Sequence, residues 1–71
     1  MKVEKSLGKL IPVDVYDKDG NLLRIEFTNS SGEHVIDAEW DFSDEQTGEN
    51  RVVFRKWVYN FMRNKGYEVA Q

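Results

Sequence analysis

Apolar and polar residues alternate in three segments of the chain, which is the pattern of half-buried β-strands. The segments are Leu10–Tyr16, Leu22–Thr28 and Glu33–Phe42. Pro12 has no N–H for a ladder, so we expect the first strand to lie at a sheet edge or Pro12 to be among its first residues. The residues expected to face the core are Ile11, Val13, Val15, Leu23, Ile25, Phe27, Ile36, Ala38 and Trp40.

Short turns join these segments. Asp17–Asn21 contains Asp-Gly between two alternating runs, and Asn29–Gly32 follows the second run. Gly accepts a positive φ, so both segments favour hairpins. Asp17, Asp19 and Asn21 also resemble the opening of a calcium loop. However, Gly20 stands at the fourth place instead of the sixth, and Thr28 occupies the place of the closing Glu. We therefore predict a plain hairpin.

The period of the pattern changes to that of a helix from Glu49 to Lys65. Ser43–Gln46 has the spacing of a capping box, and Thr47 is a second candidate N-cap. Gly66 is placed as the residue that ends the helix. The arc expected to pack on the sheet consists of Val53, Phe54, Trp57, Val58, Phe61 and Met62.

These elements predict one α+β domain spanning residues 1–71. Its architecture is a three-stranded antiparallel meander followed by one C-terminal α-helix packed on one face, which is β-β-β-α in two layers. A chain of 71 residues is too short for a second core. Residues 1–9 give a weak signal and predict a loosely held start, and residues 67–71 predict either a tail or a short strand.

The composition excludes several classes of protein. The chain has no Cys and one His, so a disulfide scaffold, a Cys-based zinc site and a Cys nucleophile are excluded. No apolar run approaches the ~20 residues of a membrane span, and the charged N-terminal segment does not read as a secretory signal. These features favour a cytoplasmic protein with no membrane partner.

Charge is unevenly distributed along the chain. The net charge is −3, yet residues 37–49 hold six acids and no base, and residues 50–65 hold five bases and no acid. Asp37, Glu39 and Asp41 recur at every second residue, so we expect them on one face of the third strand. Such a ladder is either a solvated sheet face, or a surface that binds a basic partner or imitates the phosphates of a nucleic-acid strand. We predict no metal there, because one strand does not converge its carboxylates on an ion.

The outer face of the predicted helix is the second candidate surface. Exposed Tyr and Arg are the composition of interface hot spots, and cations on a helix also suit phosphate contacts. The predicted partner-binding residues of this face are Val52, Arg55, Lys56, Tyr59 and Arg63. The nucleic-acid alternative uses Arg51, Arg55, Lys56 and Arg63, and the overall acidity of the chain argues against it.

Catalytic chemistry has little support in the sequence. His34 is the one side chain whose ordinary pKa lies near neutrality, and alternation places it on the apolar face of the third strand. No spacing ties a serine to it, and the glycines form no phosphate-binding motif. We therefore predict no catalytic residue, no metal and no cofactor.

These observations together predict a small non-enzymatic interaction or regulatory protein. It would dock on a larger protein partner through the acidic sheet face, the basic Tyr-bearing helix face, or both. Opposite charge on the two faces also permits self-association into a homo-oligomer. Small size and an acidic composition are typical of phage or bacterial accessory proteins that modulate a host enzyme. The alternative is a nucleic-acid-binding module that uses the basic helix.

Overall fold

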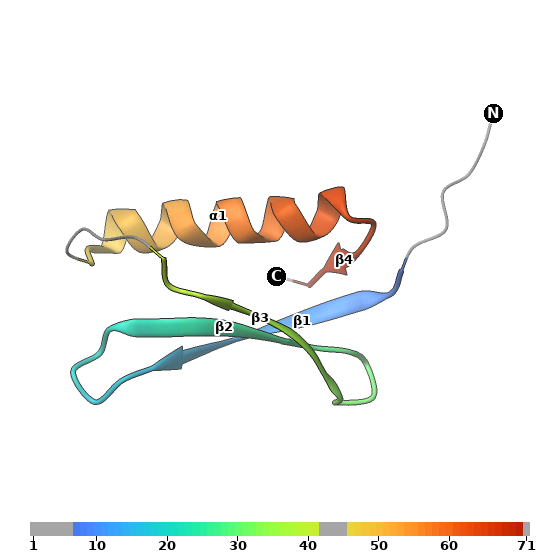
Figure 1. Ribbon diagram of the computed structural model, residues 1–71, viewed down its shortest axis with the longest axis horizontal. Coiled ribbons are helices and arrows are strands. Elements are labelled where there is room, and N and C mark those ends of the chain that lie inside the picture. The colour runs from blue at the N-terminus through green and yellow to red at the C-terminus, as the bar shows by residue number, and fades with distance from the viewer. Residues whose placement is uncertain (1–6, 42–45, 71) are drawn as a thin grey trace.

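A computed structural model describes residues 7–41 and 46–70. It confirms the expected class, an antiparallel three-stranded sheet with one C-terminal helix on one face (Figure 1). Residues 1–6, 42–45 and 71 lie outside the described residues. These include Phe42, which was predicted to end the third strand, and the first three residues of the predicted Ser43–Gln46 capping box. The elements are β1 (Lys9–Tyr16), β2 (Leu22–Thr28), β3 (His34–Glu39), α1 (Gly48–Asn64) and β4 (Glu68–Val69).

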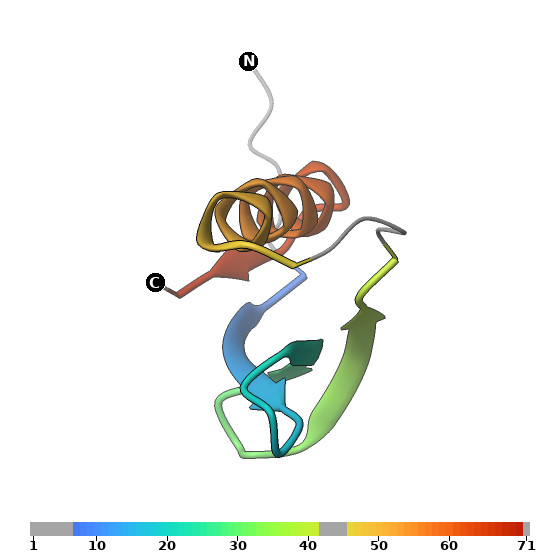
Figure 2. The same ribbon diagram turned by 90° about the vertical axis from the view of Figure 1, so that its left-hand side faces the viewer.

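The sheet has the strand order β3-β2-β1-β4. β1, β2 and β3 form the antiparallel meander, and β4 pairs with β1 in parallel. Of the two alternatives predicted for residues 67–71, the described part therefore forms a short strand, Glu68–Val69. Figure 2 looks along α1 and shows the helix above the sheet, with β4 beneath it and β3 on the opposite flank. The described chain thus leaves β3 at one edge of the sheet.

Pro12 explains why β4 is so short. The Glu68 N–H donates to the Gly8 carbonyl at 3.0 Å, and the Ala70 N–H donates to the Leu10 carbonyl at 2.9 Å. The next bond of a parallel ladder would run from residue 12 of β1 to the Ala70 carbonyl, and Pro12 has no N–H to donate. Pro12 therefore lies in a strand with neighbours on both sides, at the point where one neighbour ends.

Both predicted hairpins are confirmed, and the same type of side chain to backbone hydrogen bond stabilises both turns. The Asp17 carboxylate accepts hydrogen bonds from the backbone N–H groups two and four residues on, at 2.8 and 2.9 Å. The Asn29 side-chain oxygen accepts the equivalent bonds at 2.9 and 3.0 Å. Gly20 and Gly32 then take φ values of +86° and +84°. Side chains that bond to their own backbone in this way set the turn without long-range contacts.

The start of α1 is held by two polar side chains. Thr47 is the N-cap, and its hydroxyl accepts from the Asn50 N–H at 3.0 Å. Gln46 binds the backbone of Leu22 twice: its Oε1 accepts from the Leu22 N–H at 2.6 Å, and its Nε2 donates to the Leu22 carbonyl at 3.0 Å. The helix therefore begins at Gly48, one residue earlier than predicted, and its entry is tied to the first residue of β2.

Thr47→Ala is expected to lower the free energy of unfolding by about 1 kcal/mol, because it removes the acceptor for the Asn50 N–H. Thr47→Ser keeps the hydroxyl and is the matched control, with a smaller loss. Urea denaturation followed by circular dichroism measures both changes. An equal loss in the two variants would show that the methyl group, and not the cap, stabilises this turn.

The core consists of a few side chains from β1, β2 and α1. Phe54, Val58 and Met62 lie one above the other on the helix, since they are spaced by four residues. They pack on Ile25 and Phe27 of β2. The fully buried hydrophobic side chains among the described residues are Leu10, Leu22, Ile25, Phe27, Phe54, Val58 and Met62.

The predicted face of β1 is wrong by one residue. Leu10 is buried, whereas Ile11 and Val13 are exposed. The strand therefore directs Leu10, Pro12 and Asp14 toward the helix, because alternate residues of a strand share a face. Val15 belongs to the opposite set and is half-buried. Leu23, which was also expected in the core, is exposed at the beginning of β2.

The predicted helix arc is only half right. Val53, Trp57 and Phe61 are 52%, 64% and 44% exposed, although we expected them in the core. The helix contacts β4, and Arg55 of the helix bonds to Asp14 of β1. The sheet covers only the side of the helix that carries Phe54, Val58 and Met62. We call Val53, Trp57 and Phe61 the exposed stripe.

The third strand is shorter than predicted, and its beginning is turned. β3 ends at Glu39, so Trp40 and Asp41 lie beyond it. The pairing of β2 with β3 shifts between Phe27 and Thr28, opposite His34. A bulge of this kind changes which way the following side chains point. His34 is therefore exposed, and its expected place on the apolar face is wrong.

Candidate functional site

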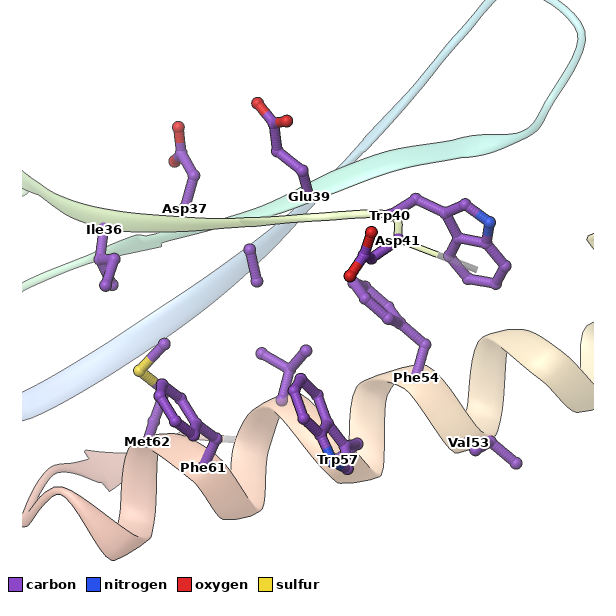
Figure 3. A pocket seen from close by; sticks show the side chains of 12 residues that line it. Ile36, Asp37, Glu39, Trp40, Asp41, Val53, Phe54, Trp57, Phe61 and Met62 are labelled. Atoms are coloured by element: carbon purple, nitrogen blue, oxygen red, sulfur yellow. The ribbon is translucent and has the colours of Figure 1, made fainter. Parts of the chain in front are cut away.

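A groove of about 690 Å³ lies between β3 and α1 (Figure 3). Ile36, Ala38 and Trp40 form the sheet wall, and the exposed stripe lies along the helix wall. The side chains of the sheet wall are half-buried and pack against the edge of the core. We call this feature the β3–α1 groove.

The helix wall of the groove is aromatic. The rings of Trp57 and Phe61 are stacked, with centroids 6.0 Å apart and planes inclined by 11°. The Lys65 ammonium lies 5.0 Å from the centroid of the Phe61 ring. At the other end, Trp40 packs on Phe54 with ring centroids 4.9 Å apart. These contacts order the aromatic side chains of the helix wall, and the Trp40–Phe54 contact joins the sheet wall to the helix wall.

The acidic side chains of β3 lie at the rim of this groove. Figure 3 shows Ile36 pointing from β3 toward the helix, and Asp37 and Glu39 pointing away from it. Asp41 is exposed at the end of the groove, beyond the last residue of the strand. The structure therefore brings the predicted acidic residues together with the exposed stripe, a combination that the sequence did not predict.

Charge on the outer face of the sheet is predominantly negative near β3. Arg24 lies opposite Glu39 in the strand register but forms its ion pair with Glu26, at 2.8 Å. The His34 ring nitrogen lies 2.5 Å from an Asp37 carboxylate oxygen. The guanidinium of Arg24 thus lies among three carboxylates, those of Glu26, Asp37 and Glu39. This end of the face therefore attracts cations.

Arg55 is half-buried against β1 and does not lie on the outer helix face where it was predicted. Its guanidinium donates to the Asp14 carboxylate at 2.5 and 3.1 Å and to the Tyr16 hydroxyl at 2.9 Å. The hydrogen bonds with Asp14 raise the pKa of Arg55, and burial of the guanidinium acts in the opposite direction. Arg55 therefore ties α1 to the inner face of β1.

Tyr59 is likewise turned toward the sheet. Its ring packs edge-on against Phe27, with centroids 6.1 Å apart. Burial raises the pKa of the Tyr59 hydroxyl, and the nearby negative charge of Asp14 adds to this. The Arg63 guanidinium lies 6.0 Å from the centroid of the Tyr59 ring on the solvent side. Tyr59 is thus a half-buried packing residue.

Of the predicted helix residues, Val52, Lys56 and Arg63 are exposed as expected. They lie apart from the residues that line the groove. Arg51 is half-buried and donates to the Gln46 side chain at 3.2 Å. The sequence contained one overlooked signal for the groove. The six apolar residues assigned to the helix arc span about 180° at ~100° per residue, which is wider than the stripe that a single packing face needs.

Comparisons of the chain with models of known protein families, with curated proteins and with solved structures gave no match. Within residues 7–41 and 46–70, no three His, Asp or Glu side chains cluster as a metal site would require. No helix of the described chain has the length and apolar character needed to cross a membrane. The function is therefore argued from the groove and its rim.

Proposed function

We propose that this chain is a non-enzymatic interaction module that docks on a protein partner through the β3–α1 groove. The observation that carries the proposal is the exposed stripe of Val53, Trp57 and Phe61, which faces an apolar strand edge. A role as a regulatory accessory protein of a phage or bacterium, acting in the cytoplasm, fits this mode of action and stays a prediction.

The exposed stripe places large apolar side chains in contact with water. A contiguous apolar surface in contact with water is unfavourable and marks an interaction site in monomeric proteins. Trp is among the residues that most often dominate binding energy, especially at the centre of a patch with a polar rim. Trp57 is 64% exposed, is stacked on Phe61, and lies across the groove from the acidic rim. A partner that covers Trp57 removes its apolar surface from water and contacts a ring whose orientation is already held by Phe61.

Small-molecule binding is less well supported by the same groove. Ligand sites present a few polar groups that converge on the ligand. Among the lining side chains that the structure describes, the charged ones are Asp37, Glu39 and Asp41, and the first two point away from the groove. The walls themselves are apolar, which suits a side chain of a protein partner.

Two of the cations that the nucleic-acid alternative requires are half-buried in the fold. Arg55 and Arg51 bond to side chains of this chain, so Lys56 and Arg63 remain exposed from the predicted cationic set. Binding to phosphate would weaken steeply with salt. Retention of the purified protein on DNA or RNA at low salt, lost at high salt, would favour this alternative over a protein partner.

Trp57→Ala is expected to abolish the capture of a protein partner while leaving the fold intact. The experiment immobilises the purified chain, exposes it to a lysate of the cells that make it, and quantifies captured proteins by mass spectrometry. Val52→Ala is the matched control, because Val52 is an exposed apolar residue of the same helix outside the groove. A partner bound by wild type and by Val52→Ala, but reduced at least about tenfold by Trp57→Ala, supports the proposal.

Two results would contradict it. If no captured protein depends on Trp57, the groove is not the docking site. If Val52→Ala removes the same partner, the outer helix face binds instead. Unfolding of each variant is measured in parallel, so that loss of capture is not confused with loss of structure.

A further inference from the structure

We propose that the partner enters the β3–α1 groove as an extended segment that adds a strand to the edge of β3. The segment would carry apolar residues alternating with Lys or Arg. This inference rests on the proposed function and names its binding mode and the chemistry of its partner. Three features of the described residues carry it: the backbone of β3, the two faces of that strand, and its charge.

The backbone of β3 is available on one side. β3 ends the strand order, and no strand of the described chain pairs with its outer edge. The Trp40 N–H donates to the Leu23 carbonyl of β2 at 2.9 Å. Backbone groups alternate in direction along an antiparallel pair, so Ala38 and Ile36 also face β2. The N–H and C=O groups of Asp37 and Glu39 therefore face outward, where an added strand would bond to them.

The side chains beside this edge define what the added strand must look like. Its residues on the helix side would lie beside Ile36 and Ala38 and contact Trp57 and Phe61. Its residues on the other side would lie beside Asp37 and Glu39, about 6.6–6.8 Å apart along the strand. Apolar side chains suit the first set of positions, and cations suit the second. The pairing thus requires a period of two in the partner sequence.

Charge also argues against a second copy of this chain as the occupant. Two β3 strands paired edge to edge would place Asp37 and Glu39 opposite the same carboxylates of the other copy. Like charges directly opposite each other destabilise a strand pair. The outer face next to β3 already holds an excess of carboxylates over the single guanidinium of Arg24. The surface is therefore complementary to a cationic segment.

The inference is tested with synthetic peptides of about eight residues, the length of an ordinary strand. The first peptide alternates Val and Lys. The second has the same composition in an order of helical period, and the third replaces each Lys with Glu. Each is titrated into the full ¹⁵N-labelled chain, and amide hydrogen exchange is followed residue by residue.

The alternating Val-Lys peptide is expected to shift the indole resonance of Trp57 and to slow exchange at the amides of Asp37 and Glu39 by about tenfold or more. The acidic peptide is expected not to bind. Equal protection by the helical-order peptide, or a shift at Trp57 without protection of the two amides, would overturn strand addition. If the groove instead binds a helix, strand addition is wrong, but the proposed docking of a protein partner in the groove still holds. The capture experiment with Trp57→Ala decides the proposed function separately.

The charge requirement has its own variant. Asp37→Asn combined with Glu39→Gln is expected to weaken the alternating peptide about fivefold or more at low salt. Asp19→Asn combined with Glu49→Gln removes the same charge away from the groove and is the matched control, with little effect. Equal weakening by both double variants would show attraction to net charge alone and would contradict specific pairing at the β3 edge. A self-associated species in sedimentation measurements that excludes the peptide would also overturn the proposal.

Discussion

Phe54→Ala will lower the free energy of unfolding by about 3–5 kcal/mol, and Trp57→Ala will change it by about 0.5 kcal/mol or less. The two residues are three positions apart on the same helix and were expected to share one apolar face. Phe54 is 2% exposed and packs on Trp40, so its removal leaves a cavity. Trp57 is 64% exposed, so its removal leaves none.

Urea denaturation of the two variants and wild type measures this difference directly. Val58→Ala and Val53→Ala form a second matched pair, because both replace a valine of α1. Val58 is buried in the core, and Val53 belongs to the exposed stripe. A large loss is expected only for Val58. If Trp57→Ala or Val53→Ala destabilised the chain as much as its buried counterpart, the helix would pack with its whole apolar arc on the sheet. The β3–α1 groove would then not exist.

The ion pair of Asp14 and Arg55 will show a coupling free energy of about 1–2 kcal/mol in a double-mutant cycle. The variants are Asp14→Asn, Arg55→Met and the two together. The side chains are 25% and 28% exposed, and the guanidinium makes two hydrogen bonds to one carboxylate oxygen. Partial burial reduces screening by water, so each single variant leaves a polar partner without its bond and costs about 1.5–3 kcal/mol.

Arg24 and Glu26 supply the control for this cycle. Their ion pair has a distance of 2.8 Å but is more exposed, and its expected coupling is below about 1 kcal/mol. The Asp14–Arg55 coupling is also expected to persist in high salt, whereas that of Arg24–Glu26 fades. A coupling near zero for Asp14 and Arg55 would mean that the helix is held in its orientation by apolar packing alone.

The turned helix has a functional consequence. The residues that looked like a binding surface, Arg55 and Tyr59, stabilise the fold, and residues that looked like core, Trp57 and Phe61, line the candidate site. The acidic residues of β3 remain part of the candidate site, but they form the rim of an apolar groove and not a separate binding face. Their expected role becomes selection of a cationic partner, with the groove supplying most of the contact area.

Local interactions made much of this fold predictable. The hairpins at Asp17 and Asn29 depend on side chains that bond to nearby backbone, and the Thr47 cap depends on a donor three residues away. The strands and the helix follow from residue periodicity, which acts over a few neighbouring positions. The ladder of Asp37 and Glu39 was predictable for the same reason, because alternation alone places them on one face.

The orientation of α1 was not predictable, because it depends on a contact between residues 41 positions apart. By sequence, the face of β1 that holds Pro12 and Asp14 looks more polar than the face that holds Ile11 and Val13. Leu10 on that polar face is nevertheless buried in the core, and Arg55 compensates the charge of Asp14 from the helix.

Periodicity and local turn residues predict the three antiparallel strands, the helix, their order and the negative charge of β3, but they leave residues 67–71 open between a tail and a strand. Contacts between elements that are distant in the sequence determine which face of β1 and which side of α1 are buried, and therefore that a groove remains beside β3. The physical reason is that periodicity specifies which residues share a face. Only packing and a paired charge between distant elements specify which face is covered.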